Sequence, residues 1–231
     1  MSLKRSGLLL VVLLSQVTPP LHSDGTPQIL LPGAYYSNLA YGLDGTWFGL
    51  CGQKMELDQV NVTVKELKTA EDGEVQYPQY EIRTDGCDKP RFLVRNINGL
   101  KEGPLKSATM DGIEDGQQIN FGGQKYSIKE DRLGKTGFQL TLGHQVNKNS
   151  LVKIEDQQHE YDSSLQPEDY RPIWEIIWAG DLDNDGKLDL VIDAAQDARA
   201  NHYHLYLSGA AGQKQIVNEV ADFEIPLDPN Y

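Results

Sequence analysis

The chain has 231 residues, of which 39% are hydrophobic and 24% are charged, and its formal net charge is −13. This length suits one domain or two small ones, and the composition is that of an ordinary folded protein rather than a disordered one. The acidic excess argues against nucleic acid as a partner, because phosphates need basic side chains, and against docking on anionic lipid. It favours a well-solvated protein that binds cations.

Residues 1–23 have the features of a secretory signal peptide. Lys4 and Arg5 precede the apolar run of residues 8–14, and Ser23 stands at the expected cleavage point. The apolar run is far shorter than the ~20 residues that a membrane-spanning helix needs, so we expect no stable membrane insertion, with an uncleaved anchor as the alternative. Cleavage would take the net charge from −13 to −15. The expected location is secreted or periplasmic.

Only two cysteines occur, Cys51 and Cys87. In an oxidising compartment they can form a disulfide, which would stabilise the fold by roughly 3–4 kcal/mol. Two separate buried thiols are the alternative, and a single pair of cysteines is weak evidence for a metal site.

Strand-like patterns dominate the chain after the signal segment. Residues 60–64, 126–128 and 138–142 alternate apolar and polar side chains, the period of a half-buried strand, and residues 91–95, 173–178 and 202–207 have strand-like composition. Gly122 and Gly123 between two such runs predict a tight hairpin, whose turn needs positive φ. Asp-Gly or Asn-Gly pairs at 85–86, 98–99, 111–112 and 115–116 mark further turns. The sequence therefore predicts a mainly β fold, an antiparallel sandwich or barrel-like sheets.

The polar segment 157–172 contains two prolines and is the predicted linker. It would separate an N-terminal β region, residues 24–156, from a C-terminal β region, residues 173–231. Residues 193–200 fit either a helical turn or a loop of small residues between two strands, and the loop is the preferred interpretation. No repeat of fixed period is visible along the chain.

One short segment carries a specific chemical signal: residues 181–189, DLDNDGKLD, which we call the aspartate loop. Aspartates at its first, third, fifth and ninth positions could offer carboxylates to a calcium ion, and its seventh residue could offer a backbone carbonyl. A glycine at the sixth position permits the sharp reversal. The predicted metal ligands are Asp181, Asp183, Asp185, Lys187 through its carbonyl, and Asp189. The alternative is a solvated acidic turn without an ion.

The aspartate loop does not fit an EF-hand. That motif requires glutamate at position 12, where this chain has Ile192. The flanking residues also look like strands, with Leu188, Leu190 and Ile192 on one face and Asp189 on the other. We therefore expect the loop at the tip of a C-terminal β-hairpin stabilised by calcium.

The segment AGDLDNDGKLDLVID resembles the calcium-binding loop of FG-GAP or VCBS-type repeats, which occur in integrin-like β-propellers and many secreted bacterial proteins. The match comprises Gly180, Asp181, Asp183, Asp185, Gly186 and Asp189, followed by the aliphatic run 190–192. The resemblance implies calcium binding but is poorly specific for activity. Only one copy is present, so a complete propeller is not expected. The chain as a whole also resembles exported bacterial proteins of unknown function with one such loop near the C-terminus.

Other signals are weaker. His202 and His204 have a spacing that can hold zinc, but no third ligand stands nearby, and exposed strand histidines are the preferred interpretation. The aromatic residues could form a carbohydrate-stacking surface, although core packing explains most of them more simply. No nucleophile elbow, zinc-protease helix or phosphate-binding loop occurs.

These observations predict an exported calcium-binding β protein, a non-catalytic module that binds a protein or glycan and contains a structural calcium site. One alternative is a secreted hydrolase that uses a pair of carboxylates, for example on carbohydrate. Another is a purely structural exported protein.

Overall fold

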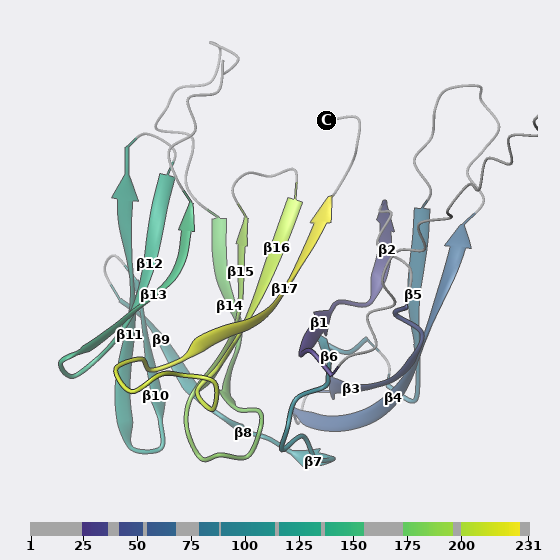
Figure 1. Ribbon diagram of the computed structural model, residues 1–231, viewed down its shortest axis with the longest axis horizontal. Helices are drawn as coiled ribbons and strands as arrows, with labels where there is room; N and C mark the ends of the chain where they lie inside the picture. Colours follow the sequence, from purple (N-terminus) through teal and green to yellow (C-terminus); the bar gives the residue numbers. More distant parts are fainter. Residues whose placement is uncertain are drawn as a thin grey trace, which may run out of the picture.

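The computed structural model describes residues 25–36, 42–52, 55–67, 79–87, 89–113, 116–134, 137–154, 173–195 and 200–226. The predicted signal peptide, 1–23, and the predicted linker, 157–172, lie outside the described residues. Within them the regular structure consists of seventeen strands in three antiparallel sheets, without a helix (Figure 1). The predicted fold class is therefore confirmed. No helix among the described residues is long and apolar enough to cross a membrane.

The N-terminal sheet has the strand order β1-β6-β3-β4-β5-β2, with β7 paired to β4. Its strands are β1 (Gln28–Leu30), β2 (Gly33–Tyr36), β3 (Gly45–Cys51), β4 (Glu56–Leu67), β5 (Gln79–Asp85), β6 (Leu93–Arg95) and β7 (Gly103–Pro104). Both end strands, β1 and β2, lie against β17 of the next sheet, so the N-terminal sheet curls into a half-barrel (Figure 1).

The central and outer sheets follow in the chain. The outer sheet has the order β13-β12-β11-β10-β9 and consists of β9 (Thr109–Ile113), β10 (Gly116–Phe121), β11 (Gln124–Leu133), β12 (Gly137–His144) and β13 (Asn147–Ile154). The central sheet has the order β17-β16-β15-β14-β8 and consists of β8 (Lys106–Ser107), β14 (Ile173–Asp181), β15 (Asp189–Ala195), β16 (Ala200–Leu207) and β17 (Asn218–Pro226).

The predicted Gly-Gly hairpin joins β10 to β11. Phe121 pairs with Gln124, and Gly122 and Gly123 between them have φ of 57° and 75°, a turn that other residues adopt only with strain. The turn predicted at residues 111–112 is wrong, because both residues lie inside β9, where pairing with β10 overrides the local turn preference. Residues 193–195 and 200 belong to strands, so the helical alternative for 193–200 is wrong for them, and 196–199 lie outside the described residues.

The central sheet is the middle of three layers and buries apolar side chains on both faces. Toward the outer sheet, Ile176, Leu190 and Ile192 pack into one core with Ile128 and Leu140. Toward the N-terminal sheet, a second core contains Trp178, Leu182, Val191, Leu205 and Leu207 together with Leu50, Phe92 and Ile97. The cores thus join residues from both sides of segment 157–172, while the division of the chain at that segment stays a prediction.

A β-bulge at Ile177 sets the direction of the side chains at the end of β14. Ile176 pairs with Ile192, but Trp178 pairs with the next residue back, Val191. Without the extra residue, Trp178 would share a face with Ile176. The bulge turns its ring to the opposite face, toward the N-terminal sheet, where it meets Phe92 edge to face.

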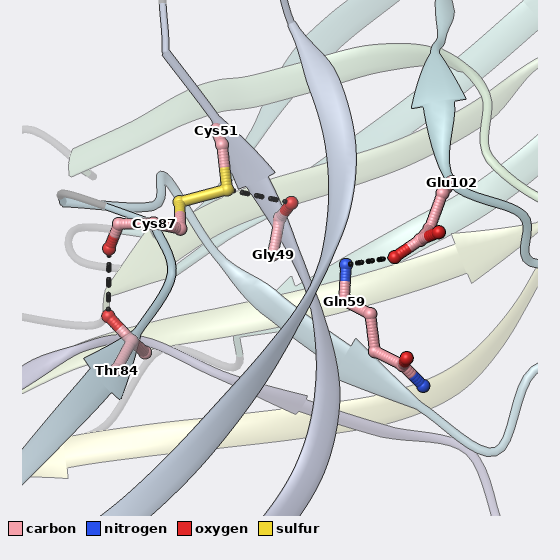
Figure 2. Close-up of a disulfide and its surroundings, with 6 residues drawn as sticks. All are labelled: Gly49, Cys51, Gln59, Thr84, Cys87 and Glu102. Atoms are coloured by element: carbon pink, nitrogen blue, oxygen red, sulfur yellow. Dashed lines mark hydrogen bonds between the residues drawn. A yellow bond between two sulfur atoms is a disulfide. The ribbon is translucent and has the colours of Figure 1, made fainter.

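Cys51 and Cys87 form a disulfide between the end of β3 and the segment after β5 (Figure 2). Cys51 Sγ lies 3.2 Å from the Gly49 carbonyl oxygen, and the Thr84 hydroxyl donates a hydrogen bond to the Cys87 carbonyl at 3.1 Å. Both cysteines are buried in the concave face of the N-terminal sheet with Trp47 and Val60. The alternative of two free thiols is therefore wrong. The bridge links the segment after β5 to the end of β3.

We expect the C51A/C87A double variant to lose about 2–4 kcal/mol of unfolding free energy, because the unfolded chain gains the freedom that the cross-link removes. Urea denaturation measures this loss. Reducing the wild-type protein with dithiothreitol should give the same decrease, since the chain has no other cysteine. A decrease below about 0.5 kcal/mol by both routes would contradict the expectation.

Candidate metal centre

The aspartate loop joins β14 to β15 at the tip of a hairpin, as the sequence predicts. Gly180 pairs with Asp189, so the two strands stay in register up to the first residues of the loop. Asn184 and Gly186 have φ of 61° and 82°, and these two left-handed residues reverse the chain. Gly180 is required by close packing, because a Cβ there would lie 2.3 Å from the Lys106 carbonyl oxygen and 2.5 Å from the Trp178 ring.

Three of the five predicted ligands come together in the aspartate cluster, Asp181, Asp183 and Asp189. One carboxylate oxygen from each lies within 4.8 Å of the other two. Asp181 is 3% exposed and Asp189 is fully buried, while Asp183 is half-buried. Oxygens at this spacing can all reach one ion at the 2.3–2.6 Å distance typical of calcium.

Asp181 has a buried carboxylate oxygen for which the described residues supply no hydrogen-bond partner. Its Oδ2 accepts a hydrogen bond from the Gly186 N–H at 3.1 Å, but its Oδ1 is buried and has no hydrogen-bond partner. A buried, unpaired carboxylate oxygen costs free energy, and the majority of buried polar atoms in folded proteins have a partner. A cation bound among the three carboxylates supplies that partner.

Asp189 is held in place by the backbone on both sides. Its Oδ2 accepts from the Leu182 N–H at 2.7 Å, and its Oδ1 accepts from the N–H and the hydroxyl of Ser208 at 2.8 and 2.9 Å. Burial raises the pKa of Asp189 to about 7 in the absence of metal, against the hydrogen bonds from Ser208 and Leu182, which lower it. Its proximity to Asp183 raises this pKa further.

The other predicted ligands play different parts. Asp183 Oδ1 accepts from the Asp185 N–H at 3.1 Å, and burial raises the pKa of Asp183. Asp185 lies outside the cluster of three: its carboxylate accepts from the Ser208 hydroxyl and the Lys187 N–H, and Lys187 Nζ lies 3.4 Å away. The Lys187 side chain is 67% exposed, which fits its predicted contribution through the backbone rather than the ammonium group.

The walls of the site come from residues that sequence analysis did not identify. Ser208 and Gly209 follow β16, the neighbour of β15, and a Cβ on Gly209 would lie 2.8 Å from Asp183 Oδ2. Gly99, from the segment after β6, lies against the backbone of Asp183. These residues lie far from the loop in sequence and carry no ligand spacing, so only an alignment or a structure could have indicated them.

The arrangement is electrostatically unfavourable without a counter-ion. Two unit charges about 5 Å apart repel by about 3 kcal/mol at an effective dielectric constant near 20. The described residues place no lysine or arginine in an ion pair with the aspartate cluster; Lys187 contacts Asp185 instead. Three oxygen donors without nitrogen or sulfur suit a hard divalent cation. The cluster can therefore bind a metal ion.

The histidines and tryptophans considered in the sequence analysis form hydrogen bonds or lie in the core. His202 Nε2 lies 3.0 Å from Asp222 Oδ2, and His204 Nδ1 lies 3.0 Å from Glu219 Oε1. The expectation of an exposed residue is wrong for His204, which is buried. Within the part of the chain that the structure describes, the aspartate cluster is the one group of three or more His, Cys, Asp or Glu side chains placed closely enough to hold a metal ion. Trp47 and Trp178 are buried, which confirms core packing for them.

Comparison with models of protein families, with curated proteins and with solved structures finds no match for this chain. The site is therefore interpreted from its own geometry.

We expect the metal-free protein to lose stability as the pH rises from 5.5 to 8. The folded-state pKa of Asp189, about 7, lies above its ordinary value near 4, so the folded protein holds this proton more tightly than the unfolded chain does. The contribution of this proton to the free energy of unfolding is complete below about pH 4 and is lost as the pH rises through 7. The change is on the order of 2–4 kcal/mol. Urea denaturation in a chelator measures it.

Saturating metal should remove this pH dependence, because the cation replaces the proton. The D189N variant is the control, since its amide does not titrate, and its metal-free stability should change less over the same range. A wild-type stability that is flat or increases from pH 5.5 to 8 in chelator would contradict the prediction.

Proposed function

We propose that this chain is an exported calcium-binding β protein, a non-catalytic module that binds a protein or glycan and uses calcium to hold the β14–β15 hairpin. The calcium part of the proposal rests on the buried Oδ1 of Asp181, which has no hydrogen-bond partner among the described residues and belongs to a cluster of three carboxylates. An acidic turn in contact with water has no such atom, because water satisfies its carboxylates.

Calcium is the proposed ion for three reasons. The donors are oxygens only, which disfavours zinc and copper. The predicted Lys187 carbonyl and the nearby carboxylate of Asp185 would add to the three clustered carboxylates, toward the six to eight ligands that calcium takes. The order of the aspartates and Gly186 also resembles FG-GAP and VCBS-type calcium loops. Magnesium prefers a smaller octahedral site and keeps several waters, so it should bind more weakly.

Export is supported by two independent features. The disulfide fits an extracellular location, because the cytosol keeps most thiols reduced. Residues 1–23 have the pattern of a signal peptide. A secreted or periplasmic protein meets millimolar or submillimolar calcium, concentrations at which sites of moderate affinity fill.

A secreted hydrolase is the second candidate, and one observation favours it. Glu175 and Asp193 are direct cross-strand neighbours on β14 and β15, and burial raises the pKa of Asp193, with the nearby Glu175 raising it further. Paired carboxylates with different pKa values are the chemistry of glycoside hydrolysis. Turnover of a polysaccharide by the wild type, abolished in E175Q and in D193N, would establish this candidate in place of the binding module.

We expect the D181N variant to lose calcium binding while its metal-free form keeps or gains stability. The amide removes one of the repelling charges, which stabilises the metal-free protein, and it replaces one buried carboxylate ligand of the cation. Calorimetric titration of metal-stripped protein measures binding. In the wild type, calcium at 100 times its Kd should add about 2.7 kcal/mol of unfolding free energy.

The matched control is D131N, the same change on the exposed face of β11 in the outer sheet. It should bind calcium like the wild type. If metal-stripped wild-type protein gives no heat with millimolar calcium, the proposed calcium site is wrong. Glycan and peptide arrays probed with calcium-loaded protein test the binding role, and a reproducible ligand that D131N also binds is the expected result.

A further inference from the structure

We propose that the calcium site is a joint between the central and N-terminal sheets, so that metal binding and the docking of the turn at residues 96–99 favour each other. This inference rests on the proposed calcium function. It adds Gly99 and Asn184, neither of which is a ligand, as positioning residues for the metal.

The 96–99 turn, which follows β6 of the N-terminal sheet, contacts the middle of the aspartate loop. Asn184 Nδ2 donates a hydrogen bond to the Gly99 carbonyl at 3.0 Å. Gly99 lies so close to Asp183 that a Cβ on it would be 2.0 Å from the Asp183 carbonyl oxygen, and its φ is 93°. The turn that follows β6 of the N-terminal sheet therefore packs directly against the backbone of Asp183, one of the three clustered carboxylates.

Leu182 makes a second connection between the same elements. It stands between two cluster members, and its N–H donates to Asp189 Oδ2 at 2.7 Å. Its side chain is fully buried in the core between the two sheets, which also contains Ile97 and Phe92. When the cation draws Asp181, Asp183 and Asp189 together, the backbone of Leu182 is fixed between them, and its side chain is fixed against the N-terminal sheet.

These contacts make the coupling reciprocal. If the cation binds the ordered loop more tightly than the loosened loop, its binding favours the ordered loop. Any contact that requires the ordered loop is then stabilised as well. The 96–99 turn makes such contacts through a hydrogen bond and close backbone packing, whereas the loop meets the outer sheet through the apolar side chain of Leu188 in their shared core. We therefore expect calcium to protect the N-terminal sheet near residues 93–104 more strongly than the β10–β13 hairpins.

Hydrogen exchange measured by mass spectrometry on the full chain tests this coupling. In the wild type, calcium should slow the exchange of backbone amides in residues 182–189 and also in residues 93–104. Peptides from residues 116–134 serve as the internal comparison and should change less than those from residues 93–104, because they meet the loop through the apolar side chain of Leu188.

The first variant is N184G, which removes the amide donor and keeps a residue that tolerates positive φ. It should weaken calcium binding by about three- to tenfold and reduce the protection of residues 93–104 while that of 182–189 persists. The matched control is Q145G, the same kind of change at an exposed position with φ of 51° in the β12–β13 hairpin. Its calcium affinity should stay within about twofold of the wild-type value.

The second variant, G99A, forces a Cβ against Asp183 and should weaken binding more than tenfold. Its control is G112A on β9, where a Cβ meets nothing within 4 Å. If G99A does not fold, N184G decides. Wild-type affinity in N184G, together with calcium-independent exchange in residues 93–104 of a protein that binds calcium, would overturn the joint and leave the calcium site standing. Absence of calcium binding in the wild type would overturn both.

Discussion

The organisation of this protein depends on three carboxylates crowded into the tip of one hairpin. Asp181, Asp183 and Asp189 lie close enough to bind one ion, and two of them are buried. One oxygen of Asp181 has no hydrogen-bond partner in the part of the chain that the structure describes. Folding brings these charges together because the strands on either side are among the most apolar in the chain. The central sheet gains free energy from burying both of its faces. A cation bound at the crowded tip, or at lower pH a proton on Asp189, would offset the repulsion there.

The position of the site in the three-layer arrangement explains how a short loop can matter for the whole fold. The loop extends from the central sheet, receives hydrogen bonds from Ser208 after β16, and touches the N-terminal sheet at Gly99. Each wall comes from a different part of the chain. A metal bound there would connect segments that are far apart in the sequence, as the disulfide connects the end of β3 to the segment after β5. The disulfide lies in the core of the half-barrel, whereas a bound metal would act at the interface between two sheets.

Much of the fold follows from local pattern. Alternation of apolar and polar residues identifies β4, β11 and β12, and the Gly122-Gly123 pair identifies the β10–β11 turn, because only residues that accept positive φ close such a hairpin. The aspartate spacing identifies the hairpin tip, and three of the five ligands predicted from it, Asp181, Asp183 and Asp189, gather there. Local pattern misleads at Asp111-Gly112, where strand pairing overrides a turn signal, and at His204, which is buried in the folded protein. In both cases neighbouring strands decide what the local residues alone do not.

The sequence by itself determined the β class, the hairpin and the chemistry of its tip, because these depend on residues close together in the chain. Tertiary structure decided which carboxylates converge, since the bulge at Ile177 sets the strand register that places Gly180 across from Asp189. It also decided that Ser208, Gly209 and Gly99 enclose the site, and that the central sheet is covered on both faces. Such contacts join residues that are tens of positions apart in the chain. They form when the sheets bury apolar surface against one another, and no local sequence pattern shows which segments will meet.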